Sequence, residues 1–143
     1  MITTILRSMV LFSLTILVFL ASQTIKAQSI HVRVLDGRSG NRIPDEKVSV
    51  LVKGEKGARE YTTNNEGDVT LSLDSSAQIF VATEWRVTCR AVKPGVVPYI
   101  SVAKIIQDGV TEQNTCGHAK SETIKGKLVI FTRKASFFEN FKR

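Results

Sequence analysis

The stretch 30–52 constrains the fold more than any other part of the chain. Three apolar residues alternate with polar ones near its start at 30–35, turn-forming residues fill 36–44, and valines resume the alternation at 48–52. Apolar residues at every second position line one face of a strand. The stretch therefore predicts two half-buried strands around a loop, and because two strands cannot cover their own apolar face, a second sheet must pack against them.

Three further segments carry strand patterns. At 68–74, apolar residues face one side and polar residues the other, which predicts a strand with one buried face. The segment 58–63 is polar and rich in β-formers, the pattern of an edge strand whose charges discourage unwanted pairing. A continuous apolar run at 128–131, within 127–133, predicts a last strand that is buried on both faces.

The longest β-like run is 78–92, and we predict it as the central strand. Five residues of one parity are apolar, Trp85 and Cys89 among them, so we expect the one Trp and this Cys on the same interior face. Prolines and a glycine at 93–98 then force a loop. A helix has one candidate, where Ser101 precedes apolar residues spaced i, i+3, i+4, although so short a segment leaves a strand interpretation open.

These patterns together predict the fold class. Six to seven short strands at regular spacing, with at most one short helix, are typical of an all-β, antiparallel Greek-key β-sandwich. The chain shows no internal repeat and no low-complexity linker. We therefore expect one β-sandwich domain of about seven strands.

Residues 1–27 have the pattern of an export signal. A basic residue precedes an apolar run at 9–21, and the segment ends in small or apolar residues before a cleavage point after Ala27. The run is roughly 13 residues, short of the about 20 that a membrane-spanning helix needs. We expect cleavage and one mature domain over 28–143, exported to the periplasm or secreted. The alternative is an uncleaved N-terminal anchor, because the uncharged interval from Ser8 to Ile25 is 18 residues long.

The mature chain is basic. Residues 1–27 hold two of the 20 basic residues and none of the 13 acidic ones, which leaves a net charge of +5. The Lys and Arg residues are scattered over outward strand positions and turns, whereas a nucleic-acid-binding surface gathers them beside exposed aromatics. We expect no nucleic-acid partner. The excess charge favours anionic envelope polymers or membrane surfaces through weak, salt-sensitive attraction.

Cys89 and Cys116 are the only two cysteines. An even count in an exported chain favours a disulfide, and closing a loop of about 28 residues stabilises a domain by roughly 3 to 4 kcal/mol. One alternative is a metal site in which His118 joins both cysteines, but no Cys-x-x-Cys pair and no fourth ligand accompany it. Free buried thiols are the other alternative.

The first half of the chain resembles a known family. The motifs lie between Ile30 and Leu73, and their residues are Val32-Arg-Val-Leu-Asp36-Gly, Ser39-Gly40, Ile43-Pro44, Val48-Ser-Val50 and Tyr61-Thr-Thr63-Asn-Asn-Glu66-Gly67. They resemble the carboxypeptidase regulatory-like domain, a prealbumin-like (transthyretin-like) sandwich, and the second half is similar to small exported bacterial proteins that carry this domain alone. The resemblance implies a non-catalytic module for adhesion, envelope assembly or protein interaction.

His31 has an enzymatic alternative within the same fold. The 5-hydroxyisourate hydrolases carry a His just before Val-Leu-Asp on their first strand, and His31-Val-Arg-Val-Leu-Asp36 resembles that motif with two extra residues. The C-terminal Tyr-Arg-Gly-Ser of those enzymes is missing, and His118 is a poor second His. We therefore expect His31 to be an outward strand residue and no residue to be catalytic.

Two other chemistries of such sandwiches are disfavoured by composition. A Lys–Asn isopeptide needs a Lys on the first strand and an Asn on the last, but 30–35 has no Lys and 127–133 has no Asn. The loop acids lack the alternating ligand spacing of a calcium loop, and Asp beside Gly usually builds turns. No cofactor is expected.

The C-terminal tail is the one candidate contact surface. Phe137, Phe138 and Phe141 lie among charged residues, which suits either a hydrophobic groove on a partner or a lipid interface; packing over the open end of the domain's own sandwich is the alternative. We expect a binding or scaffolding module whose partner is an envelope protein or an anionic polymer. The alternative functions are membrane-surface binding, through the tail or an uncleaved signal, and the hydrolase.

Overall fold

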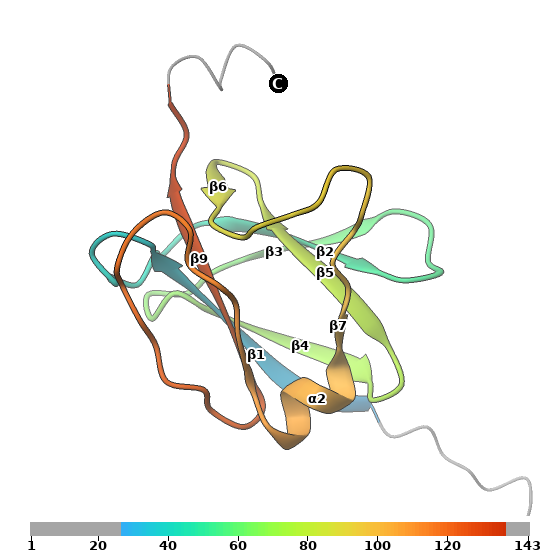
Figure 1. The fold of residues 1–143 in the computed structure, drawn as a ribbon. Coiled ribbons are helices and arrows are strands. Elements are labelled where there is room, and N and C mark those ends of the chain that lie inside the picture. Colours follow the sequence, from blue (N-terminus) through green and yellow to red (C-terminus); the bar gives the residue numbers. More distant parts are fainter. Residues whose placement is uncertain (1–26, 137–143) are drawn as a thin grey trace, which may run out of the picture.

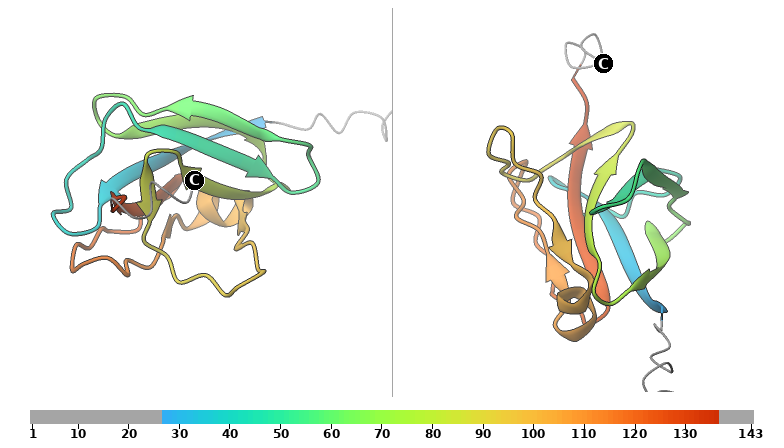
Figure 2. Two further views of the ribbon diagram at one scale, coloured as in Figure 1. Left: turned by 90° about the horizontal axis from the view of Figure 1, so that it is seen from above. Right: turned by 90° about the vertical axis from the view of Figure 1, so that its right-hand side faces the viewer.

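The computed structural model describes residues 27–136. Within that range nine strands and one short helix form two sheets packed face to face (Figure 1). The views in Figure 2 show the two layers edge-on. The predicted all-β sandwich with one short helix is therefore confirmed.

The first sheet is built around the last strand of the described chain. Its strands run in the spatial order β4-β1-β9-β6, with β8 also paired to β9. Their bounds are β4 Asp68–Asp74, β1 Ala27–Asp36, β9 Lys127–Lys134, β6 Arg86–Thr88 and β8 Val110–Thr111. Because β1 occupies one edge of β9, the short strands β6 and β8 share its other edge, one toward each end.

The second sheet has four strands in the order β3-β2-β5-β7. Their bounds are β3 Ala58–Thr62, β2 Lys47–Val52, β5 Gln78–Thr83 and β7 Ile100–Ser101. The strand β3 lies at the sheet edge with four of its five residues exposed, as its polar sequence predicts. At the other edge β7 pairs with only two residues of β5, so most of that edge of β5 has no strand beside it.

The antiparallel prediction is wrong for one strand. The strand β9 runs parallel to β1 and parallel to β8, and the other pairs that join the strands are antiparallel. A parallel pair needs a long crossover connection, and here nearly the whole domain lies between β1 and β9. Sequence alternation reports which face of a strand is buried but carries no information on the direction of its neighbours.

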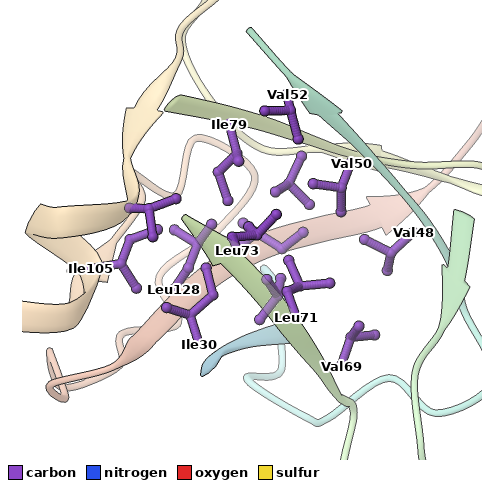
Figure 3. Close-up of a cluster of buried hydrophobic side chains, with 14 of the residues drawn as sticks. Ile30, Val48, Val50, Val52, Val69, Leu71, Leu73, Ile79, Ile105 and Leu128 are labelled. Carbon is purple, nitrogen blue, oxygen red and sulfur yellow. The ribbon is translucent and has the colours of Figure 1, made fainter. Parts of the chain in front are cut away.

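The core lies between the two sheets. Alternate side chains of β1, β2, β4, β5 and β9 point into it, and the helix adds two more (Figure 3). Its fully buried members are Ile30, Val32, Val34, Val48, Val50, Leu71, Ile79, Val81, Val102, Ile105, Leu128 and Ile130. The predicted alternations in 30–52 and 68–74 are thereby confirmed, as is the burial of the last strand on both faces.

The predicted helix is present as α2, Val102–Gln107. The side chain of Ser101 accepts a hydrogen bond from the backbone N–H of Lys104, as an N-cap does. Val102 and Ile105 are buried against the core. The helix therefore closes one end of the sandwich, at the bottom of Figure 1.

The predicted central strand at 78–92 is wrong. The chain leaves the second sheet after β5, turns at 84–85, and enters the first sheet as its edge strand β6. Trp85 lies in that turn and is 56% exposed, whereas Cys89 is buried. The expected shared interior face of these two residues therefore does not exist. The alternation of apolar residues continues across the turn although the strand itself does not.

A second, smaller apolar cluster lies on the outer face of the first sheet. Leu35, Val129 and Phe131 point away from the main core and pack with Cys89, Cys116 and Ala119. The segment 112–119, which follows β8 and which we call the disulfide segment, covers them. This cover explains why the last strand is apolar on both sides.

Candidate functional site

The two cysteines form a disulfide, Cys89–Cys116. It joins the end of β6 to the segment that covers the outer cluster, and both thiols are thereby removed as metal ligands. In residues 27–136 no three His, Cys, Asp or Glu side chains are grouped as a metal site. The predicted pairing is confirmed.

The disulfide segment packs tightly against the end of β1. The Asn114 Nδ2 donates hydrogen bonds to the carbonyls of Gly37 (2.7 Å) and Ala119 (2.9 Å). A Cβ at Gly37 would lie 2.7 Å from Asn114 Oδ1, closer than Cβ atoms normally approach, and 3.1 Å from the Cys89 sulfur. A larger residue at 37 would therefore displace the Asn114 side chain that joins β1 to the disulfide segment.

A buried polar cluster fills the end of the sandwich opposite α2. Arg86 forms an ion pair with Asp36, and its Nε donates to Thr132 Oγ1 at 2.8 Å. The Thr132 hydroxyl in turn donates to the carbonyl of Leu35. Burial raises the pKa of Asp36, but hydrogen bonds from Ser39, Arg38 and Arg86 together lower it by more. The pKa of Asp36 therefore lies below its ordinary value. These groups fasten β1, β6 and β9 to one another.

Glu46 belongs to the same end and is 4% exposed. Its carboxylate accepts a hydrogen bond from the backbone N–H of Trp85 at 3.0 Å. Burial raises the pKa of Glu46, and the hydrogen bond and the charge of Arg86 partly offset that rise. The carboxylate therefore holds the 84–85 turn in place, which is a structural use of a buried acid.

Arg90 and Glu112 form a second buried pair, on the side of the molecule where the β5 edge is open. Their side chains are 6% and 10% exposed, and Arg90 Nη1 lies 3.1 Å from Glu112 Oε1. Arg90 also lies 4.8 Å from the centre of the Phe80 ring and donates to the carbonyl of Val81. That carbonyl is on the edge of β5 that no strand covers, so the guanidinium takes the place of a neighbouring strand.

Burial of this pair shifts the pKa values of both groups. Burial raises the pKa of Glu112 to about 6, against the opposing charge of Arg90, and burial lowers the pKa of Arg90. Among the described residues, Arg90 Nε and Nη1 have no hydrogen-bond partner. The pair is thus held by charge and packing, and it connects the β5 edge to the disulfide segment.

A cavity of about 390 Å³ lies under the disulfide segment, on the outer face of the first sheet. Glu112, His118, Lys120 and Phe131 are among its lining residues. The cavity is open to solvent, and the Glu112 carboxylate is paired with Arg90. It therefore combines polar groups with an aromatic floor.

His31 faces outward from β1, as predicted. It is exposed, and its Nδ1 lies 3.1 Å from the hydroxyl of Thr70 on the neighbouring strand. In register it stands opposite Lys127 on β9, whereas His118 lines the cavity at Phe131, further along the same strand. The structure does not bring the two imidazoles into one site.

Large exposed hydrophobic side chains gather at one end of the molecule. Five are exposed among residues 27–136, and four of them, Trp85, Val92, Val96 and Val97, are about half exposed. They lie on the β5–β6 turn and on the loop from β6 to β7. In Figure 1 and in the right-hand view of Figure 2, this turn, this loop and the end of β9 are all at the top, away from α2. We call the four residues the apolar end.

Basic side chains accompany the apolar end. No acidic residue occurs in 85–107. The ammonium of Lys47 lies 5.5 Å from the Trp85 ring centre, and it also forms an ion pair with the half-exposed Glu84. Lys93 lies in the loop itself and is exposed. The end therefore combines aliphatic, aromatic and positively charged groups.

Sequence patterns miss the apolar end almost entirely. Val96 and Val97 follow a Pro-Gly pair and precede another proline, so the loop is predicted, but the exposure of its valines is not. The predicted contact residues Phe137, Phe138 and Phe141 lie outside the described residues. The strand β9, which precedes them in the sequence, ends at this same end of the molecule (Figure 1).

Within residues 27–136, the one helix is too short to cross a membrane. The disulfide is consistent with an oxidising, exported location. In comparisons with known proteins, the chain matches no family model, no curated protein and no solved structure.

Proposed function

We propose that this chain is an exported, prealbumin-like β-sandwich of the carboxypeptidase regulatory-like type that acts by binding and not by catalysis. The observation that carries the proposal is the gathering of four of the five exposed large hydrophobic side chains at one end. Single exposed apolar residues are ordinary, whereas a group of them marks a contact surface. The partner therefore binds at the apolar end.

The buried polar groups support a binding role. Ion pairs and hydrogen bonds already engage the charged groups of Arg86, Asp36 and Glu46. These interactions brace the turn that carries Trp85. The disulfide fixes β6, from which the apolar loop departs. The polar interior thus serves to hold the apolar end rigid, and a rigid surface loses less entropy on binding.

Export is the second part of the proposal. The pattern of a signal peptide at 1–27 and the disulfide agree with an oxidising compartment. The mature protein is then a single sandwich in the periplasm or the secreted fraction.

Site-specific photocrosslinking in the producing cell tests the binding role. A benzophenone side chain replaces Val97 in one variant and Ile124 in the control. Ile124 is similarly exposed (45%), but it touches Gly109 just after α2, at the opposite end. We expect crosslinked adducts from position 97 and none from 124. Equal adducts from both positions, or none from either, would contradict a binding role for the apolar end.

A further inference from the structure

We propose that two copies of this protein form a symmetric dimer through the free edge of β4. In this dimer the β4 strands of the two copies pair antiparallel and join their first sheets into one continuous sheet. The contact lies on β4 and not at the apolar end, so the inference goes beyond the proposed binding function and does not depend on it.

The edge of β4 lacks the features that usually protect an edge strand. The strand is the outermost one of the first sheet, and its seven residues pair with β1 in one unbroken register. Between its terminal acids it contains no charged residue and no proline. Charges, prolines, bulges and short length are the usual means of preventing edge-to-edge pairing. The outermost strand of the second sheet, β3, carries such charges, Arg59 and Glu60. Of these two edges, β4 is therefore the one open to pairing.

The backbone groups on this edge follow from the pairing with β1. Gly67 precedes β4, and its carbonyl accepts a hydrogen bond from the backbone N–H of Val34 on β1. Because the backbone groups of successive residues point to opposite sides of a strand, those of Thr70 and Ser72 point to the free edge. Both residues are exposed. The centre of the edge therefore offers two N–H donors and two C=O acceptors to a partner strand.

The two ends of the edge are already occupied. The terminal acids Asp68 and Asp74 face the same side as the central groups. The carbonyl of Asp68 accepts from the backbone N–H of Asn64, and the N–H of Asp68 donates to the Asn64 side chain at 3.0 Å. The carbonyl of Asp74 accepts from the backbone N–H of Ala77. Pairing with a partner is therefore confined to the centre of the strand.

A second copy satisfies the free groups in one register. When Leu71 of one copy lies opposite Leu71 of the other, Thr70 of each copy stands opposite Ser72 of the other. Opposed residues of this kind exchange both N–H···O bonds in an antiparallel pair, so four hydrogen bonds form and use every free group of the two residues. A shift by two residues pairs them with the terminal acids instead, whose carbonyls are occupied. The two-fold axis therefore passes at Leu71.

Charges on the outer face of the sheet match in this register. Asp74 of each copy stands opposite Asp68 of the other, on the same face of the joined sheet. Asp68 is held by two cations, with Arg33 Nε at 2.7 Å and Lys127 Nζ at 3.4 Å from its carboxylate. The two cations exceed this one carboxylate by one positive charge, which the Asp74 of the second copy neutralises. The contact occurs twice around the two-fold axis, so the edge is complementary to itself.

Sedimentation velocity measures the self-association of the exported protein, as processed by its host, from micromolar to millimolar concentration. We expect a reversible equilibrium between monomer and dimer. Species larger than the dimer are not expected, because pairing uses the free β4 edge of both copies.

A charge swap locates the contact. The double variant Thr70→Lys with Ser72→Lys places like charges opposite each other twice, and we expect the dissociation constant to rise by about tenfold or more. The double variant Thr70→Glu with Ser72→Glu should show the same loss. An equimolar mixture of the two variants should restore a dimer, because each Lys then faces a Glu.

The matched control is Gln113→Lys with Thr115→Lys. It adds the same charge at exposed positions of the disulfide segment, which the disulfide joins to β6 at the other edge of the first sheet. Its dissociation constant should stay near that of the parent protein. Circular dichroism and thermal melting verify that all the variants remain folded.

Three results would overturn the inference. They are a monomer at every concentration, a dimer that the β4 and control variants weaken equally, and a mixture of the oppositely charged variants that stays monomeric. Crosslinking from position 97 reports on the apolar end alone, so the binding function and the dimer stand or fall separately.

Discussion

Arg90 and Glu112 have the most buried side chains of any ion pair described in residues 27–136. Moving two charges out of water is costly, and the mutual attraction offsets that cost only when the geometry and hydrogen bonds are favourable. Here two guanidinium nitrogens lack hydrogen bonds, and burial dominates the pKa of the carboxyl. This ion pair therefore connects the β5 edge to the disulfide segment without adding much to the free energy of unfolding.

The pKa of Glu112 predicts a pH dependence of stability. The folded-state pKa, about 6, exceeds the ordinary value of 4.5, so the folded protein holds the proton more tightly than the unfolded chain. Stability therefore falls as the pH rises from about 4.5 to 6, by about 2 kcal/mol, since each pKa unit is worth about 1.4 kcal/mol. The variant Glu112→Gln should lose this pH-dependent part of the free energy of unfolding.

Urea unfolding of the parent protein and of Glu112→Gln across pH 4.5 to 7.5 measures the effect. Both proteins share all other titrating groups, so the difference between the two stability profiles isolates Glu112. Parallel profiles would show that the carboxyl titrates normally in the folded state.

Among the elements, α2 has one side-chain cap, at its N-terminus. The helix has only six residues, and Ser101 accepts from the backbone N–H of Lys104. Short helices are marginal without caps and packing. Ser101→Ala should destabilise the domain by about 1 kcal/mol.

The matched control is Ser72→Ala on the exposed face of β4, where the expected change is within about 0.5 kcal/mol. Chemical denaturation compares the two variants. A loss at Ser101 no larger than at Ser72 would show that α2 is held by Val102 and Ile105 alone.

The strands show how far a pattern reaches. Alternation predicted the buried faces of β1, β2 and β4, and a continuous apolar run predicted the two-sided burial of β9, because these signals come from burial itself. The prediction of one strand over 78–92 was wrong because no Gly or Pro marks the turn at 84–85. The apolar residues also keep the same parity after the chain has entered the other sheet. A change of sheet is a tertiary event that local alternation does not record.

The candidate site is less predictable than the fold for a related reason. The disulfide follows from counting two cysteines in a chain with an export signal. The Arg90–Glu112 pair and the apolar end join segments far apart in sequence, and loop valines carry no periodic signal of exposure. Only the assembled sheets bring the turn of Trp85 and the loop of Val96 to one end of the molecule.

At the scale of the whole molecule, the disulfide links the sandwich to the cover of its outer face. The two cysteines are 27 residues apart, and closing a loop of that size stabilises the folded state by roughly 3 to 4 kcal/mol in the chain-entropy description. Replacing both Cys89 and Cys116 by Ser should therefore lower the free energy of unfolding by about that amount. Denaturant titrations of the oxidised protein and the double variant measure it, and equal midpoints would contradict the expectation.

The position of β9 has a consequence for biogenesis. The last strand of the described chain occupies the middle of its sheet, between β1 and β6. The strand β1 can pair with β4 early in synthesis, but its other edge has no partner until the ribosome has passed Lys134. Pairing of such distant segments is slow. On the proposed route of export, the first sheet is consequently completed only after nearly all of the chain has crossed the translocation channel.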